Sequence, residues 1–119
     1  MRVMVFLGTV ACTAAFAKMS INPNSVSLLP NQCFVLTAHF SEATASVRKI
    51  NVTSDHPGVR VFASSDCSGV PTVTVSGSLR SFSFSILPDG AIAPGRYSVG
   101  VDSTTQERSE SAKAKVSVP

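Results

Sequence analysis

Two cysteines, Cys33 and Cys67, are the residues of this chain whose chemistry is easiest to anticipate. They lie 34 positions apart (67 − 33), and neither has a second cysteine or a histidine at the spacing of a metal-binding motif. In an exported protein, such a pair is a candidate for a disulfide bond. We therefore predict a Cys33–Cys67 disulfide and no metal site; two free thiols are the alternative.

The residues around the two cysteines indicate where this bond would lie. Cys33 is out of phase with the apolar face of the segment that follows it, 34–40, whereas Cys67 lies in the polar, turn-like segment Ser64–Gly69. We expect the bond to act as a staple at an edge or rim, and not to pass through the core. Closing a loop of this length would stabilise the fold by about 3–4 kcal/mol.

The histidines and acidic residues form no catalytic pattern. His39 lies in a predicted strand and His56 in a predicted turn, so the two histidines are isolated from one another in the sequence. No serine occurs in the nucleophile motif G-x-S-x-G, and no glycine-rich phosphate loop is present. We predict that the protein is not an enzyme and that it needs no cofactor.

Two turn segments are the candidate binding loops. In the first, Asp55-His56-Pro57-Gly58, the proline presets φ and the glycine tolerates positive φ. The second, Pro88-Asp89-Gly90, closes a strongly alternating segment. We expect Asp55, His56 and Gly58, together with Asp89 and Gly90, to contact a protein or a surface polymer.

Charge and aromatic content argue against two classes of ligand. The formal net charge is +3, and no run of lysine and arginine alternates with aromatic residues, as a nucleic-acid groove would require. There is no tryptophan and only one tyrosine, so an aromatic platform for sugars is not expected. Phe62 is out of phase with Val59 and Val61, which makes it the best candidate for an exposed aromatic side chain.

The first 17 residues have the layout of a secretory signal peptide. Arg2 precedes an apolar stretch, and Ala15-Phe16-Ala17 has the A-x-A form of a cleavage site. We predict a signal peptide at 1–17, a single domain at 18–119, and a secreted, periplasmic or cell-surface location. A buried strand or an uncleaved anchor is an alternative for 1–17, and a lipid attached to Cys12 is another route to the membrane.

The rest of the chain alternates between apolar and polar residues with a period of two, which is typical of half-buried strands. The clearest example is Ser81–Leu87, in which Phe82, Phe84 and Ile86 fall on one face. The other expected strands are Ser25–Leu29, Gln32–Phe40, Val47–Ser54, Val59–Ala63, Val70–Ser76, 97–102 and 112–118. Seven to eight strands separated by proline and glycine turns predict an all-β antiparallel sandwich.

The order of these signals resembles the bacterial Ig-like domains of secreted and surface proteins. The resemblance spans about residues 20–119. Three segments carry it: 22–28 with Pro30-Asn31-Gln32, Arg80–Leu87, and the Ala-Pro-Gly-x-Tyr-x-Val sequence of Ala93–Val99. It implies that Pro94 and Gly95 form a tight turn and that the Tyr97 hydroxyl bonds back to the backbone, as in a tyrosine corner.

The resemblance also sets the expected range of functions. Domains of this family serve as spacers, adhesin stalk modules, carbohydrate-binding accessories and virion surface domains. We therefore expect an Ig-like binding or structural module that acts in adhesion or assembly through protein–protein contacts. The alternatives are a pilus-like or virion accessory subunit and a carbohydrate-binding accessory domain. A pilus-like subunit would lack its own last strand, which 112–118 supplies here.

Overall fold

The computed structural model describes residues 19–40, 46–106 and 109–119. The predicted signal peptide, 1–17, and Cys12 within it lie outside the described residues. No helix long and apolar enough to span a bilayer occurs in the part of the chain that the structure describes.

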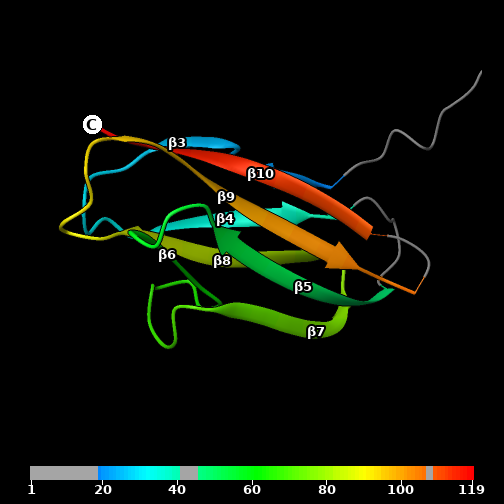
Figure 1. Ribbon diagram of the computed structural model, residues 1–119. Coiled ribbons are helices and arrows are strands. Elements are labelled where there is room, and N and C mark those ends of the chain that lie inside the picture. The colour runs from blue at the N-terminus through cyan, green and yellow to red at the C-terminus, as the bar shows by residue number, and fades with distance from the viewer. Residues whose placement is uncertain (1–18, 41–45, 107–108) are drawn as a thin grey trace, which may run out of the picture.

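The described strands form two stacked sheets (Figure 1). The five-stranded sheet has the order β3-β10-β9-β5-β7, and the four-stranded sheet has the order β2-β4-β8-β6. In chain order the strands are β2 (Ser20–Asn22), β3 (Ser25–Ser27), β4 (Phe34–His39), β5 (Ser46–Ser54), β6 (Val59–Phe62), β7 (Val73–Leu79), β8 (Ser81–Pro88), β9 (Gly95–Thr104) and β10 (Ser109–Val118). The predicted fold class, an all-β sandwich, is confirmed.

The expected strands differ from the observed ones in number and in detail. Nine strands lie within the described residues, against the seven to eight expected, and the added one is the short strand β2. The strand expected at Val70–Ser76 begins only at Val73, because Thr72 N donates to Val70 O at 2.8 Å and closes a turn there.

The sandwich also contains one parallel pair, which corrects the expectation of purely antiparallel sheets. β3 runs parallel to β10, with Lys115 opposite Ser25 and Ser117 opposite Ser27. Two backbone hydrogen bonds bracket the pair, from Lys115 N to Asn24 O and from Leu28 N to Ser117 O, both 2.9 Å long. Within the described residues, the chain therefore passes from one sheet, as β2, to the other, as β3.

The core lies between the sheets and follows the alternation seen in the sequence. Phe84 and Ile86 of β8 are fully buried, and so are Val99 and Val101 of β9. Ala114, Val116 and Val118 of β10 face the same core. Burial of about 25 cal/mol per Å² of apolar surface makes this face the main source of stability.

A buried arginine at one end of the core was not singled out from the sequence. Arg48 is only 2% exposed, and it forms an ion pair with Glu110, with Arg48 Nη1 3.9 Å from Glu110 Oε2. Arg48 Nε donates to Leu79 O at 3.1 Å and Nη1 donates to Ser103 Oγ at 2.8 Å, while the guanidinium lies 4.1 Å from the centre of the Phe40 ring. These contacts offset the cost of removing the charge from water.

The predicted disulfide is confirmed and lies on the outer face of the four-stranded sheet. Cys33 and Cys67 are bonded, with their Cα atoms 6.0 Å apart. Cys67 belongs to the β6–β7 loop, which folds back over β8, and Cys67 N donates to Ser85 Oγ at 3.0 Å. Ser85 in turn donates to Ser64 O at 2.7 Å. We call the surface that this loop buries the covered face.

The covered face explains why the prediction for Phe62 was wrong. Phe62 was expected to be exposed because it is out of phase with the core residues Val59 and Val61. It is opposite Ser85 in the β6–β8 register and therefore points to the same outer face. Phe62 is only 5% exposed and Ser85 is fully buried. A loop that the sequence pattern does not reveal buries both side chains.

Candidate functional site

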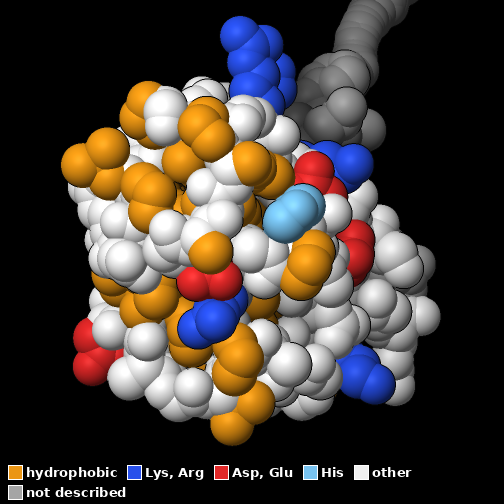
Figure 2. Space-filling model, turned by 60° about the vertical axis from the view of Figure 1, so that its left-hand side comes forward, with side chains coloured by type: hydrophobic (Ala, Val, Ile, Leu, Met, Phe, Trp, Pro, Cys, Tyr) orange, Lys and Arg blue, Asp and Glu red, His pale blue; other side chains and the backbone are white. Residues whose placement is uncertain are grey.

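The two predicted binding loops lie side by side at one end of the sandwich. Asp89 N donates to Gly58 O at 2.7 Å, which joins the loops directly. Arg60 and Asp89 form an ion pair with 3.8 Å between Nη2 and Oδ2. In Figure 2, which turns this end toward the viewer, hydrophobic side chains are spread over the surface with few charged groups among them. We call this region the loop end.

Asp55 connects the first loop to β9. Asp55 Oδ1 accepts from Ser98 N at 3.0 Å, and Oδ2 accepts from Ser98 Oγ at 3.2 Å. Asp55 N donates to Ser98 O at 3.0 Å. Because both carboxylate oxygens accept bonds from within the domain, Asp55 positions the loop and is a poor candidate for direct contact with a partner.

His56 is held by its own turn and by the β9 tyrosine. Its Nδ1 accepts from Gly58 N at 2.9 Å, and its ring meets the Tyr97 ring edge-on with centroids 5.1 Å apart. A Cβ atom on Gly58 would lie 2.9 Å from His56 Nδ1 and 3.1 Å from the Ile92 side chain. A side chain at position 58 would therefore have to displace His56 or Ile92.

The segment Pro94-Gly95-Arg96-Tyr97 leads into β9. Tyr97 Oη donates to Ala93 O at 2.6 Å, across the turn that contains Pro94 and Gly95. This bond ties the half-buried Tyr97 to the backbone four residues before it. Tyr97 therefore braces the loop end from within, and its ring also supports His56.

A third loop, which the sequence analysis did not assign to the site, completes the loop end. Asn31 N donates to Pro88 O at 2.7 Å, and Asn31 adopts a positive φ of 66°. A Cβ atom on Gly90 would lie 2.8 Å from Asn31 Nδ2, so the two loops are in close contact. Leu29, in the same loop, is 60% exposed. The pairing of β4 with β8 brings this loop to the site, and no local motif indicates it.

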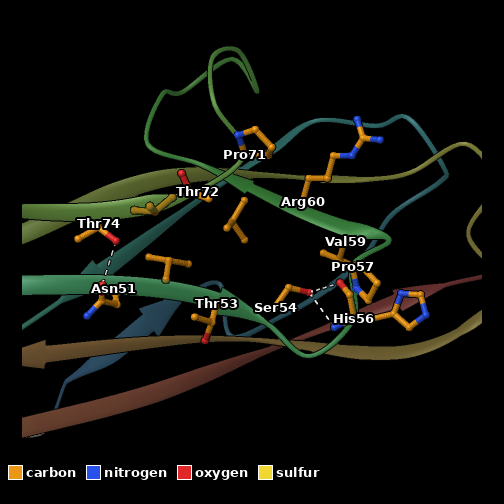
Figure 3. A pocket seen from close by; sticks show the side chains of 13 residues that line it. Asn51, Thr53, Ser54, His56, Pro57, Val59, Arg60, Pro71, Thr72 and Thr74 are labelled. Carbon is orange, nitrogen blue, oxygen red and sulfur yellow. Dashed lines mark hydrogen bonds between the residues drawn. The ribbon is translucent and has the colours of Figure 1, made fainter.

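A groove of about 530 Å³ opens beside the first loop, between β5, β6 and the start of β7 (Figure 3). Its walls include four buried valines and the turn residues His56 and Pro57. Polar groups border it, among them Asn51 and Thr74, whose side chains are joined by a 3.0 Å hydrogen bond. The valines of the groove are Val52, Val59, Val61 and Val73. The second loop, with Asp89 and Gly90, is not part of its lining.

The groove lies where both sheets end. β6 is the outer strand of the four-stranded sheet, and β7 is the outer strand of the five-stranded sheet. Outer strands carry backbone N–H and C=O groups that no neighbouring strand pairs. The arrangement therefore combines apolar walls with backbone groups that can accept another strand.

The remaining polar candidates do not converge on one point. His39 pairs with Ser20 and Ser81 at the opposite end of the sandwich from His56. No group of three or more His, Cys, Asp or Glu side chains suited to a metal ion occurs among residues 19–40, 46–106 and 109–119. In the β6–β7 loop, the pKa of the Asp66 carboxyl lies below its usual value. The main cause is a hydrogen bond from the Ser68 hydroxyl, and a bond from the Ser64 hydroxyl adds to it.

Comparisons with known proteins place the chain in a class by fold. A scan against protein-family models and a search of curated proteins found no match. Among solved structures, a conjugative transposon lipoprotein from Bacteroides eggerthii superposes with a TM-score of 0.60 at 8% identity, over 83% of this chain and 94% of that one. A family 123 glycoside hydrolase from Clostridium perfringens gives 0.50 at 11% identity, over 82% of this chain and 22% of the hydrolase.

These likenesses concern the fold alone. The protein is an all-β, Ig-like sandwich, and no sequence family is identified. A fold of this kind hosts many unrelated functions, so the function has to be argued from the surface of this chain.

Proposed function

We propose that this protein is an extracytoplasmic binding module that holds a protein partner by an extended segment laid along the groove between β6 and β7. The observation that carries the proposal is the position of the groove. Its valine walls adjoin the outer strands of both sheets. In β-strand addition, main-chain hydrogen bonds supply affinity and pockets for alternate side chains supply specificity.

The features around the groove fit such a role. β7 has seven residues, no proline and no charged side chain, so it lacks the usual devices that keep an edge strand from pairing. The first predicted loop closes one end of the groove through His56 and Pro57. Since Tyr97 and Asp55 hold that loop in place, the end of the groove is preorganised and binding would cost little ordering entropy.

An extracytoplasmic location is supported by two features of the chain. Disulfide bonds persist in oxidising compartments, and Cys33–Cys67 is bonded. Residues 1–17 have the composition of an export signal. A lipoprotein with the same fold is compatible with this location.

Binding accounts for the surface better than catalysis or polymerisation. The two histidines lie at opposite ends of the sandwich, and His56 Nδ1 accepts a bond within its own turn. A pilus-like subunit needs a partner to supply its last strand, whereas β10 fills that place here between β9 and β3. A sugar platform based on Phe62 is disfavoured because that ring is buried.

Peptide display on the purified domain tests the proposal. Random peptides about ten residues long, enough for one strand, are selected on the wild-type protein and their affinities measured by fluorescence polarisation. Thr72→Trp places a large ring at the mouth of the groove and should weaken binding by at least about tenfold, or 1.4 kcal/mol. Ser78→Trp puts the same ring at the far end of β7, outside the groove, and is the matched control.

The proposal predicts that selected peptides alternate apolar and polar residues and that Ser78→Trp binds them as the wild type does. Equal binding to the two tryptophan variants would overturn it. So would failure to select any peptide that competes for the groove.

A further inference from the structure

The outer face of the five-stranded sheet carries a cluster of positive charge that the groove does not use. In the β9–β10 register, Lys115 is opposite Ser98 and Ser117 is opposite Arg96, so these four side chains share one face. Lys113 follows one step further along β10, opposite Gly100. We call the region formed by Arg96, Gly100, Lys113 and Lys115 the basic patch.

Short hydroxyl side chains surround the cations. Ser25 of β3 is opposite Lys115 on the other side of β10. A shallow depression of about 470 Å³ is lined by Arg96, Lys115, Asp55, Tyr97 and the serines at positions 25, 98 and 117. A ligand there would meet two cationic groups together with hydroxyls that can both donate and accept hydrogen bonds.

The acid nearest to the patch is already engaged. Asp55 also lines the depression, but both of its oxygens accept hydrogen bonds from Ser98. The next acid on this face, Asp102, lies one row beyond Gly100, opposite Ser111. Three cations, Arg96, Lys113 and Lys115, therefore outnumber the two carboxylates that border them, Asp55 and Asp102.

The glycine at position 100, in the middle of β9, is an independent feature that points to a ligand at the basic patch. Glycine within a strand lowers stability and often marks a bulge, a sharp bend or a place where a ligand approaches closely. The β9 register is continuous on both sides, so no bulge occurs at Gly100. A Cβ atom at this position would meet nothing closer than 3.9 Å, so the fold itself leaves room for a side chain.

We propose that the basic patch binds an anionic polysaccharide, whose acidic groups pair with Arg96, Lys113 and Lys115 and whose sugar rings lie flat over Gly100. The bare glycine lets a ring approach the sheet, and the serine hydroxyls meet the sugar hydroxyls. Recognition then depends on charge and hydrogen bonding and needs no aromatic stacking. The inference concerns a surface other than the groove and stands whether or not the groove binds a peptide.

The composition of the patch favours a polysaccharide over the other anionic polymers. Protein interfaces are enriched in aromatic residues, methionine and arginine and depleted in lysine and serine, so this surface, apart from Arg96, has the opposite composition. Proteins that bind single-stranded nucleic acid add aromatic side chains on which the bases stack. The basic patch and the depression beside it hold lysine, arginine, serine and glycine. The one aromatic ring that lines the depression, Tyr97, is already held by Ala93 O and packs against His56.

Calorimetric titration with oligogalacturonate, a chain of carboxylate-bearing sugars, tests the proposal. Neutral maltooligosaccharide of equal length, polyglutamate and oligothymidylate are the comparison ligands. We expect oligogalacturonate to bind most tightly and its affinity to fall as salt is raised, because salt screens exposed charges. Neutral maltooligosaccharide should give no measurable heat.

Three variants separate the parts of the site. Gly100→Val adds a side chain where a sugar ring would lie against the sheet. It should weaken binding by at least about tenfold, or 1.4 kcal/mol, without lowering the thermal midpoint. Lys113→Gln combined with Lys115→Gln should weaken it by a similar factor. Arg80→Gln removes one positive charge at an exposed corner between β7 and β8 and should bind like the wild type.

Four results would overturn the inference. They are no binding of oligogalacturonate, equal binding of the neutral chain, equal or tighter binding of polyglutamate or oligothymidylate, and a Gly100→Val variant that binds as well as the wild type. The lysine variants keep the test valid if Gly100→Val fails to fold.

Discussion

The two outer faces of the sandwich are built from the same kind of alternating strand but differ where the β6–β7 loop lies. On the four-stranded sheet, the β6–β7 loop and the Cys33–Cys67 bond bury Phe62 and Ser85. On the five-stranded sheet, which we call the open face, the outward residues are mostly serine, threonine, lysine and glycine, and most of them are exposed. Here Val47 remains 75% exposed.

This difference shows what a loop can do to a strand pattern. An outward residue on the open face has solvent as its neighbour, so substitutions there should change stability little. An outward residue on the covered face is in effect a core residue, and a polar atom there needs a partner. The face of a strand therefore does not by itself decide whether a residue is buried.

Removing the disulfide should have the largest effect on stability, because it frees the loop that covers one outer face. Cys33→Ser with Cys67→Ser frees the loop and should lower the free energy of unfolding by about 3–4 kcal/mol, the loop-closure contribution. Urea denaturation followed by circular dichroism measures the loss. Reducing agent should destabilise the wild type by a comparable amount and leave the double variant unchanged. An unaltered midpoint after reduction would contradict this view of the covered face.

Truncating one apolar side chain on each outer face should lower stability by very different amounts. Phe62→Ala should cost about 3 kcal/mol, because it leaves a cavity beneath the loop. Val47→Ala removes apolar atoms from a side chain that is already exposed, and should change stability by no more than about 0.5 kcal/mol. The same denaturation experiment compares them, and similar losses for the two variants would show that the loop does not bury Phe62 in solution.

A pair of serines makes the same comparison for polar groups. Ser85→Ala takes the acceptor from Cys67 N and the donor from Ser64 O, and leaving such groups unsatisfied should cost about 1–3 kcal/mol. Ser76, exposed on the outer side of β7, serves as the control, with an expected change within about 0.5 kcal/mol. Hydrogen exchange at the Cys67 amide should rise in Ser85→Ala only. Unchanged protection there would argue against the bond.

The smallest expected effect has the opposite sign. Gly100→Ala on the open face should raise the stability by about 0.5–1 kcal/mol, because alanine loses less backbone entropy on folding and its Cβ atom has space. The midpoint of thermal unfolding measures this change in stability. A destabilised variant would mean that the backbone at Gly100 needs glycine for the fold, and would remove one support for the basic patch.

Much of the fold could be predicted because strand alternation is a local property. The faces of β8, β9 and β10 were correctly assigned from spacing alone, since a residue and its second neighbour in a strand always share a face. The disulfide could be predicted by counting cysteines. The errors occurred where contacts that the strand pattern does not reveal determine the structure. They are the parallel β3–β10 pair, the delayed start of β7, and the burial of Phe62.

The candidate site was predicted in part for the same reason. Turn chemistry identified Asp55–Gly58 and Asp89–Gly90 as loops, but not that a hydrogen bond joins them or that Asp55 serves β9. The Asn31 loop and the groove were missed. Both are assembled by strand pairing, which gathers residues whose own neighbours in the sequence carry no signal.

By itself, the sequence determined the class of structure: alternating strands, tight turns and one disulfide, all set by short-range sterics and the polarity of each side chain. Only the tertiary structure decided which surfaces exist. It buried Phe62 under a loop, placed Arg48 within the core, formed the groove between β6 and β7, and aligned Arg96, Lys113 and Lys115 around Gly100. These features depend on which strands pair and in what register, and that choice is made by the burial of the whole core.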